Sequence, residues 1–190
     1  MSAGGPDAAR GLAAGGQADL LEANRRYAAS FDRAGVPARP ARRVAVLTCM
    51  DSRVDPLRLL GLELGDAHVL RNAGGRAADD ALRSLIVSTQ LLGTRVLLVI
   101  HHTDCGMLGL HDADLRARLE RDTGVDASGI DFLGFDDLHE SVRDDVDRVR
   151  TCRLLPEGIE VHGYVYDVAS GVLTPVADDD SEPGDPARSA

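Results

Sequence analysis

The sequence predicts an α/β fold, with a central, mainly parallel β-sheet flanked by helices and an antiparallel hairpin or edge strand at the C-terminal end. Three short apolar runs, residues 44–48, 67–70 and 95–100, alternate with segments of helical spacing. A β-α-β-α-β order of this kind calls for a mainly parallel sheet. Residues 161–168 and 172–176 alternate in part and are joined through a Ser-Gly pair, which is typical of a hairpin.

Helical segments are predicted before, between and after these strands. Residues 19–31 place apolar side chains at roughly helical spacing, which indicates an amphipathic helix with its apolar side facing the core. A short helix is expected after Pro56, ended by Gly65. The segment 79–92 starts with two aspartates, whose charge suits the first turn of a helix. Residues 112–122 and 136–149 are predicted to form charged surface helices.

Domain organisation follows from length and composition. A chain of 190 residues can bury a core without disulfides, and we expect a single domain over residues 17–177. Residues 1–16 are rich in Ala and Gly, and residues 178–190 carry an acidic run with two prolines. Such compositions offer little apolar surface to bury, so both ends are predicted to be disordered.

Charge and composition exclude several classes of function. The formal net charge of -10 opposes nucleic-acid binding, which needs a basic surface. The chain has no lysine, which excludes a Schiff-base or P-loop lysine mechanism. No apolar run is long enough to span a bilayer, and an odd number of cysteines favours a reducing compartment. We therefore expect a cytoplasmic protein that acts on a small molecule, with no nucleic-acid or membrane partner.

Metal-binding side chains follow two of the predicted strands. Cys49, with Asp51 and Arg53 just beyond it, follows the first strand, and His102 and Cys105 follow the third. Sites in parallel sheets lie at the carboxyl ends of strands. Catalytic zinc takes three protein ligands, with thiolate and imidazole among its preferred donors, and two thiols with one imidazole make such a set. A buried cysteine beside a loop histidine is the alternative interpretation.

Three motifs follow successive predicted strands: Cys49-x-Asp51-x-Arg53, the run Arg71-Asn72-Ala73-Gly74-Gly75, and His102-x-x-Cys105-Gly106. In this order and spacing they resemble the β-class carbonic anhydrases, in a compact bacterial-type form. The resemblance implies one Zn²⁺ per chain and reversible hydration of carbon dioxide to bicarbonate and a proton by zinc-bound hydroxide. It also implies a homodimer or a higher homo-oligomer.

The same resemblance implies a role for each site residue. Cys49, His102 and Cys105 ligate zinc, and Asp51 and Arg53 form the catalytic pair beside it. Asp51 orients the hydroxide, and the planar guanidinium of Arg53 suits bidentate pairing with that carboxylate. In a closed state Asp51 leaves Arg53 and becomes the fourth zinc ligand. No other cofactor is expected.

The sequence leaves the substrate and some residue assignments open. The same zinc scaffold serves enzymes that hydrolyse carbonyl sulfide or carbon disulfide, and the motifs do not separate these substrates. A metal-free thiol module and a structural zinc module also stay open as interpretations. His101 lies one residue further from Cys105 than His102 does, and the resemblance selects His102 as the ligand. Cys152 is expected to be a lone thiol, and Asp104 either orients its loop or pairs with Arg71.

Overall fold

A computed structural model describes residues 16–177 of the chain. The predicted disorder at the two ends falls outside these residues, apart from Gly16. The chain divides into two compact units, Met1–Val36 and Pro37–Ala190. Among residues 16–177 no helix combines the length and the apolar composition that crossing a bilayer requires. The prediction of one domain over residues 17–177 stays a prediction.

The first unit contains helix α1, Gly16–Ala29. Glu22 accepts hydrogen bonds from Arg25 and Arg26 on the polar side of the helix. None of its residues is buried, and Leu20 is 72% exposed. The expectation that its apolar side faces the core stays a prediction.

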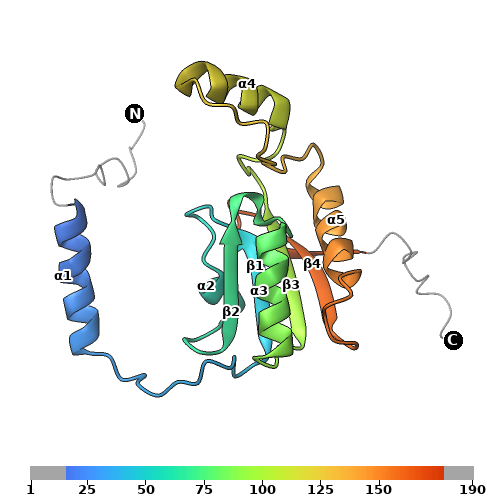
Figure 1. Cartoon of the computed structure of the whole chain (residues 1–190). Coiled ribbons are helices and arrows are strands. Elements are labelled where there is room, and N and C mark those ends of the chain that lie inside the picture. The colour runs from blue at the N-terminus through green and yellow to red at the C-terminus, as the bar shows by residue number, and fades with distance from the viewer. Residues whose placement is uncertain (1–15, 178–190) are drawn as a thin grey trace, which may run out of the picture. The chain divides into compact units, whose positions relative to one another are not determined.

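The second unit is built on one five-stranded sheet, in which the strands are ordered β2-β1-β3-β4-β5 (Figure 1). Their bounds are Val44–Cys49 for β1, Ala67–Asn72 for β2, Val96–His102 for β3, Glu160–Tyr166 for β4 and Leu173–Val176 for β5. The first four strands pair in parallel, and β5 pairs antiparallel with β4. This arrangement confirms the predicted fold class.

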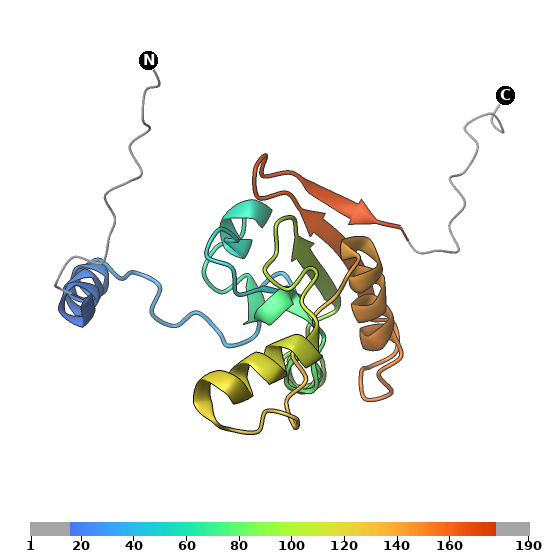
Figure 2. The ribbon, with the colours of Figure 1, turned by 90° about the horizontal axis from the view of Figure 1, so that it is seen from above.

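Helices α3, Asp79–Gln90, and α5, Leu138–Arg150, pack on one face of the sheet, and α2, Pro56–Leu60, lies on the other (Figure 2). A further helix, α4, spans Asp112–Thr123 and lies beyond the carboxyl edge of the sheet. The main core is formed where α3 and α5 meet β1, β3 and β4. Its buried residues are Ala45, Leu47, Ala77, Ala81, Leu85, Leu97, Val99, Val142, Val146, Val149, Val161 and Val165.

Several element boundaries differ from the sequence prediction, and three of them lie near the candidate site or show a clear cause. Strand β3 continues through His101 and His102, which pair with β4, so both histidines lie in the strand and not in the loop after it. Strand β2 likewise continues to Asn72. Helix α2 ends at Leu60 because Gly61 takes a left-handed conformation with φ of 61°. Polar residues ended the predicted strands too early, since backbone pairing does not require an apolar side chain.

Candidate metal centre

Two neighbouring strands bring the three predicted ligands together. Cys49 is the last residue of β1 and His102 is the last of β3, and these strands pair side by side in parallel. Cys105 lies in the turn that follows β3. The two sulfur atoms and an imidazole nitrogen all lie within 4.8 Å of one another, and all three residues are buried. This is the arrangement that the sequence predicts.

The imidazole of His102 is oriented by the backbone beside it. Its Nδ1 lies 2.8 Å from the carbonyl oxygen of Thr103, which can accept the Nδ1 hydrogen. The Nε2 atom is buried and has no hydrogen-bond partner. Histidines that ligate metals usually donate their other ring N–H in this way, which leaves a lone pair for the metal.

The two thiols of the pair influence each other strongly. The hydrogen bond with Cys105 holds the pKa of Cys49 well below its usual range, against burial, and the backbone N–H groups of Asp51 and Gly74 lower it further. Hydrogen bonding to Cys49 and then burial raise the pKa of Cys105. Burial opposes protonation of His102, but its contacts with Cys49 and Thr103 raise its pKa. Cys49 therefore loses its proton more readily than Cys105, and the thiolate is the form of cysteine that binds a metal.

Asp51 is held beside this group by Arg53. The Nη2 atom of Arg53 donates to Oδ2 of Asp51 at 2.8 Å, while its Nε atom and its backbone N–H both donate to Oδ1. Hydrogen bonds from the Arg53 side chain, and then from its backbone, keep the pKa of Asp51 well below its usual range. Oδ2 also lies 3.9 Å from Nε2 of His102. The carboxylate is therefore anionic and borders the metal centre.

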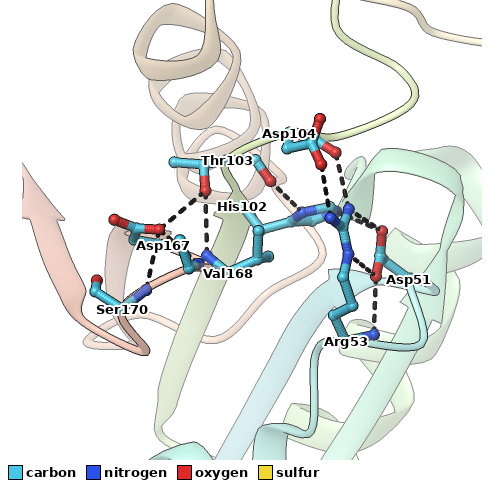
Figure 3. A network of polar contacts seen from close by, with 9 residues as sticks. Asp51, Arg53, His102, Thr103, Asp104, Asp167, Val168 and Ser170 are labelled. Carbon is cyan, nitrogen blue, oxygen red and sulfur yellow. Dashed lines mark hydrogen bonds and ion pairs between the residues drawn. The ribbon is translucent and has the colours of Figure 1, made fainter. Parts of the chain in front are cut away.

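Arg53 also joins the two loops that follow β1 and β3. Figure 3 shows its guanidinium between Asp51 and Asp104. Nη1 lies 2.6 Å from Oδ2 of Asp104, and Nη2 donates to the Asp104 carbonyl oxygen. Asp104 has a φ of 54°, a left-handed conformation that Asp adopts more readily than most residues. The partner of Asp104 is thus Arg53 and not Arg71.

Arg71 instead fixes the backbone of the first loop. Its Nε donates to the carbonyl oxygen of Cys49 at 3.0 Å and its Nη2 to that of Asp51 at 2.6 Å. One side chain from β2 therefore holds the backbones of both Cys49 and Asp51. The sequence places Arg71 in a motif but does not show this role.

The β4–β5 turn contacts Thr103, the residue that follows His102. The backbone N–H of Thr103 donates to Tyr166, and the Thr103 hydroxyl oxygen accepts from the N–H of Val168. Asp167 accepts hydrogen bonds from Ala169 at 2.8 Å and, at longer range, from the Thr103 hydroxyl (Figure 3). The sequence predicts this hairpin turn but not its contact with Thr103, because residues so distant in sequence show no shared pattern.

Other chemically active side chains lie outside the metal group. His101 has its Nε2 3.1 Å from Asp145 on α5, on the side of β3 that faces the main core. His68, in β2, contacts the Ser88 hydroxyl and the Ala38 carbonyl. Cys152 is a free cysteine outside the group. His111, His139 and His162 are exposed. Among residues 16–177, Cys49, His102 and Cys105 form the one group suited to a metal.

The donor set fits zinc. Two sulfur atoms and one imidazole nitrogen are donors that zinc prefers, and three protein ligands are typical of a catalytic rather than a structural zinc site. A cation at this position explains the buried Nε2 atom of His102, which has no hydrogen-bond partner in the protein. The described residues therefore meet the requirements for this metal.

Comparisons with known proteins agree with the fold and with the donor set. A family model described as carbonic anhydrase matches residues 44–128. The β-carbonic anhydrase 1 of Mycobacterium tuberculosis is 39% identical over 158 residues, covering 83% of this chain and 96% of the relative. A carbon disulfide hydrolase of Saccharolobus solfataricus is 34% identical over 156 residues, covering 70% of this chain and 76% of the relative.

A solved structure shows the same fold. The crystal structure of a carbonic anhydrase from Streptococcus mutans superposes with a TM-score of 0.81 and 46% sequence identity, covering 84% of this chain and 96% of the other. The sequence, the fold and the donor set thus indicate the same family. The chain belongs to the β-carbonic anhydrase family, whose members are zinc enzymes that interconvert carbon dioxide and bicarbonate.

Proposed function

We propose that this chain catalyses the reversible hydration of carbon dioxide to bicarbonate and a proton, with one Zn²⁺ held by Cys49, His102 and Cys105. The observation that carries the proposal is the buried group of three donors with an anionic carboxylate beside it. A zinc ion bound there supplies Lewis acidity, which brings the pKa of a water ligand down to about 7 and makes hydroxide available at neutral pH.

Asp51 and Arg53 orient the reaction. Because Asp51 is kept ionised by Arg53, it can accept a hydrogen bond from the nucleophile and direct its lone pair towards the substrate. Arg53 limits the rotation of that carboxylate by three hydrogen bonds. The loop carrying the carboxylate is held in turn by Arg71. The chain itself therefore supplies positioning, while the proton leaves to solvent or buffer.

The Asp51-Arg53 ion pair can also open, which gives the site a second, closed state. If Asp51 rotates away from Arg53, its carboxylate oxygen becomes available as a fourth zinc ligand and closes the site. Arg53 retains Asp104 as a partner in that state, which lowers the cost of the change. Structures determined across a range of pH would decide, and an Asp51-Arg53 pair that never breaks would contradict the closed state.

The test of the proposed function is zinc quantification together with stopped-flow carbon dioxide hydration for the native chain, Asp51→Ala and a control, Asp55→Ala. Asp55 caps α2 and accepts a hydrogen bond from the backbone N–H of Arg58, so its loss affects stability and not the reaction. We expect about one zinc per chain in all three proteins and a fall in kcat/KM of about 100-fold for Asp51→Ala alone. A native chain that binds zinc but does not hydrate carbon dioxide contradicts the proposal.

A hydrolase of carbon disulfide or carbonyl sulfide is the second candidate, because a carbon disulfide hydrolase is among the similar proteins. Zinc ligands alone do not separate the two reactions, since the same nucleophile attacks either carbon. Carbon dioxide hydration and sulfide release from carbon disulfide and carbonyl sulfide, measured on one preparation, separate them. Dominant sulfide release would replace the first proposal, and a folded protein without zinc would favour a metal-free thiol module.

We also infer a homodimer or a higher homo-oligomer in the cytoplasm. Both units leave large apolar side chains exposed, including Tyr27 on α1 at 56% and Leu91 after α3 at 68%. A second copy of the chain would cover such groups with no further partner. Three free cysteines suit a reducing compartment. Light scattering tests the oligomeric state, and cell fractionation tests the compartment.

A further inference from the structure

A buried ionic cluster lies behind the metal centre and takes no part in the proposed reaction. Asp145 on α5 has Oδ2 at 2.8 Å from Nε of Arg76 and at 3.1 Å from Nε2 of His101. Nδ1 of His101 lies 2.9 Å from the hydroxyl of Ser141, which is also on α5. Only 4% of the Asp145 side chain, 13% of the Arg76 side chain and none of the His101 side chain are exposed.

Stability alone does not explain this cluster. Removing charged groups from water carries a large penalty, and apolar residues of similar volume often replace a buried ion pair without loss of stability. Both contacts of Asp145 fall on one oxygen, and neither has hydrogen-bond geometry. A more specific role is therefore required to account for charges in the core of the protein.

The positions of the two partners of Asp145 indicate that role. His101 directly precedes the ligand His102 in β3. Arg76 directly follows Gly75, which packs against the backbone of the ligand Cys49. One carboxylate therefore contacts both the strand that carries His102 and the turn that packs against the backbone of Cys49.

Phe135 connects the cluster to the sulfur atoms. Its ring stacks on His101 at a centroid distance of 5.6 Å, and the guanidinium of Arg76 lies 5.5 Å from the ring centroid. The same side chain packs in one buried cluster with Cys49 and Cys105. A displacement of Arg76 or His101 therefore reaches the ligands through packing as well as through the backbone.

We propose that Asp145 is a positioning residue for the metal centre: by holding Arg76 and His101, it fixes the turn that packs against Cys49 and the strand that presents His102, and so keeps both ligands in metal-binding geometry. The inference rests on the proposed zinc ligands and goes beyond them, since Asp145 touches neither the ligand atoms nor the substrate.

The test compares zinc affinity with the stability of the metal-free protein. The variant Arg76→Met/Asp145→Leu replaces the ion pair by apolar groups, and Asp145→Asn keeps the shape of the side chain while removing its charge. The control, Asp79→Leu/Arg148→Met, removes the surface ion pair that joins α3 to α5 away from the site. Zinc dissociation constants are measured by competition with a chelator, and Co²⁺ absorption spectra report ligand geometry.

We expect the apolar double variant to raise the zinc dissociation constant about 10- to 100-fold and to change the Co²⁺ spectrum, with a similar melting temperature for the metal-free protein. Asp145→Asn should raise the constant about 10-fold, and the control should leave it unchanged. Native affinity in either folded Asp145 variant overturns the proposal, and if the double variant does not fold, Asp145→Asn decides. A native chain that fails to bind zinc would instead overturn the proposed function.

Discussion

Gly75 lies directly against the backbone of Cys49. A Cβ atom at position 75 would lie 2.9 Å from the Cys49 nitrogen, closer than real Cβ atoms approach other atoms. The φ angle of Gly75 is 72°, which residues with a side chain rarely adopt. The turn after β2 therefore passes close over the end of β1 only because this residue has no side chain.

Gly75→Ala is expected to destabilise the protein by at least about 2 kcal/mol and to weaken metal binding, because the new methyl group must displace the backbone of a ligand. Denaturant unfolding and zinc stoichiometry measure the two effects. Gly61→Ala is the matched control, since Gly61 has a φ of 61° but nothing within 4 Å of the added Cβ. It should cost about 1 kcal/mol and keep zinc. Equal costs in the two variants would show that the close approach to Cys49 is unimportant.

Removal of one sulfur ligand should abolish stable zinc binding. Cys105→Ser replaces a thiolate by a hydroxyl, a far weaker zinc donor, and leaves two protein ligands of the three. Cys152→Ser removes a thiol outside the metal group and should retain about one zinc per chain. Elemental analysis after gel filtration gives the stoichiometry. Loss of zinc from both variants, or from neither, would contradict the ligand assignment.

The positions of the ligands could be predicted from the sequence because they depend on local order. An apolar run that ends in Cys49, and a second that ends near His102, predict two strand ends, and in a parallel sheet such ends meet at one edge. The resemblance, together with the spacing to Cys105, then favoured His102 over His101. The structure adds the physical reason, since His102 lies in the metal group while His101 contacts Asp145.

The supporting contacts could not be predicted in this way. The pairing of Arg53 with Asp104 depends on the left-handed backbone of Asp104, which is set by the turn and not by a sequence pattern. Asp145 is separated by tens of residues from the strand end that it contacts, and in the sequence it belongs to a charged helix.

Asp112 should give a pH-dependent contribution to the stability of the segment around α4. Burial raises its pKa, but the backbone N–H groups of Phe132, Gly134 and Leu133 lower it more, so the folded pKa lies below the unfolded value of about 3.9. A depressed carboxyl pKa stabilises the folded state fully above the unfolded pKa, and the contribution is lost as pH falls towards the folded pKa.

Asp112→Asn is therefore expected to lower the free energy of unfolding by about 1 kcal/mol at pH 6 and by progressively less below about pH 4. Denaturant unfolding across this pH range gives the difference from the native chain. Asp114→Asn, an exposed position in the same helical turn, is the control and should show little difference at either pH. A deficit of Asp112→Asn that stays constant down to about pH 2.5 would contradict the assignment.

Disruption of the apolar side of α1 should shift the proposed oligomer towards monomers. Leu20 is 72% exposed, and the rings of Tyr27 and Phe31 lie 5.4 Å apart at the end of the same helix and just after it. Leu20→Asp places a charge among these groups, which would have to be desolvated in an interface. Ala18→Asp makes the same change in charge on the polar side of α1. Light scattering at several concentrations should show dissociation for Leu20→Asp alone, with the unfolding temperature now dependent on concentration.

A Leu20→Asp protein with the mass of the native assembly would show that α1 does not form the interface. A native chain that is monomeric at all concentrations would exclude the oligomer itself.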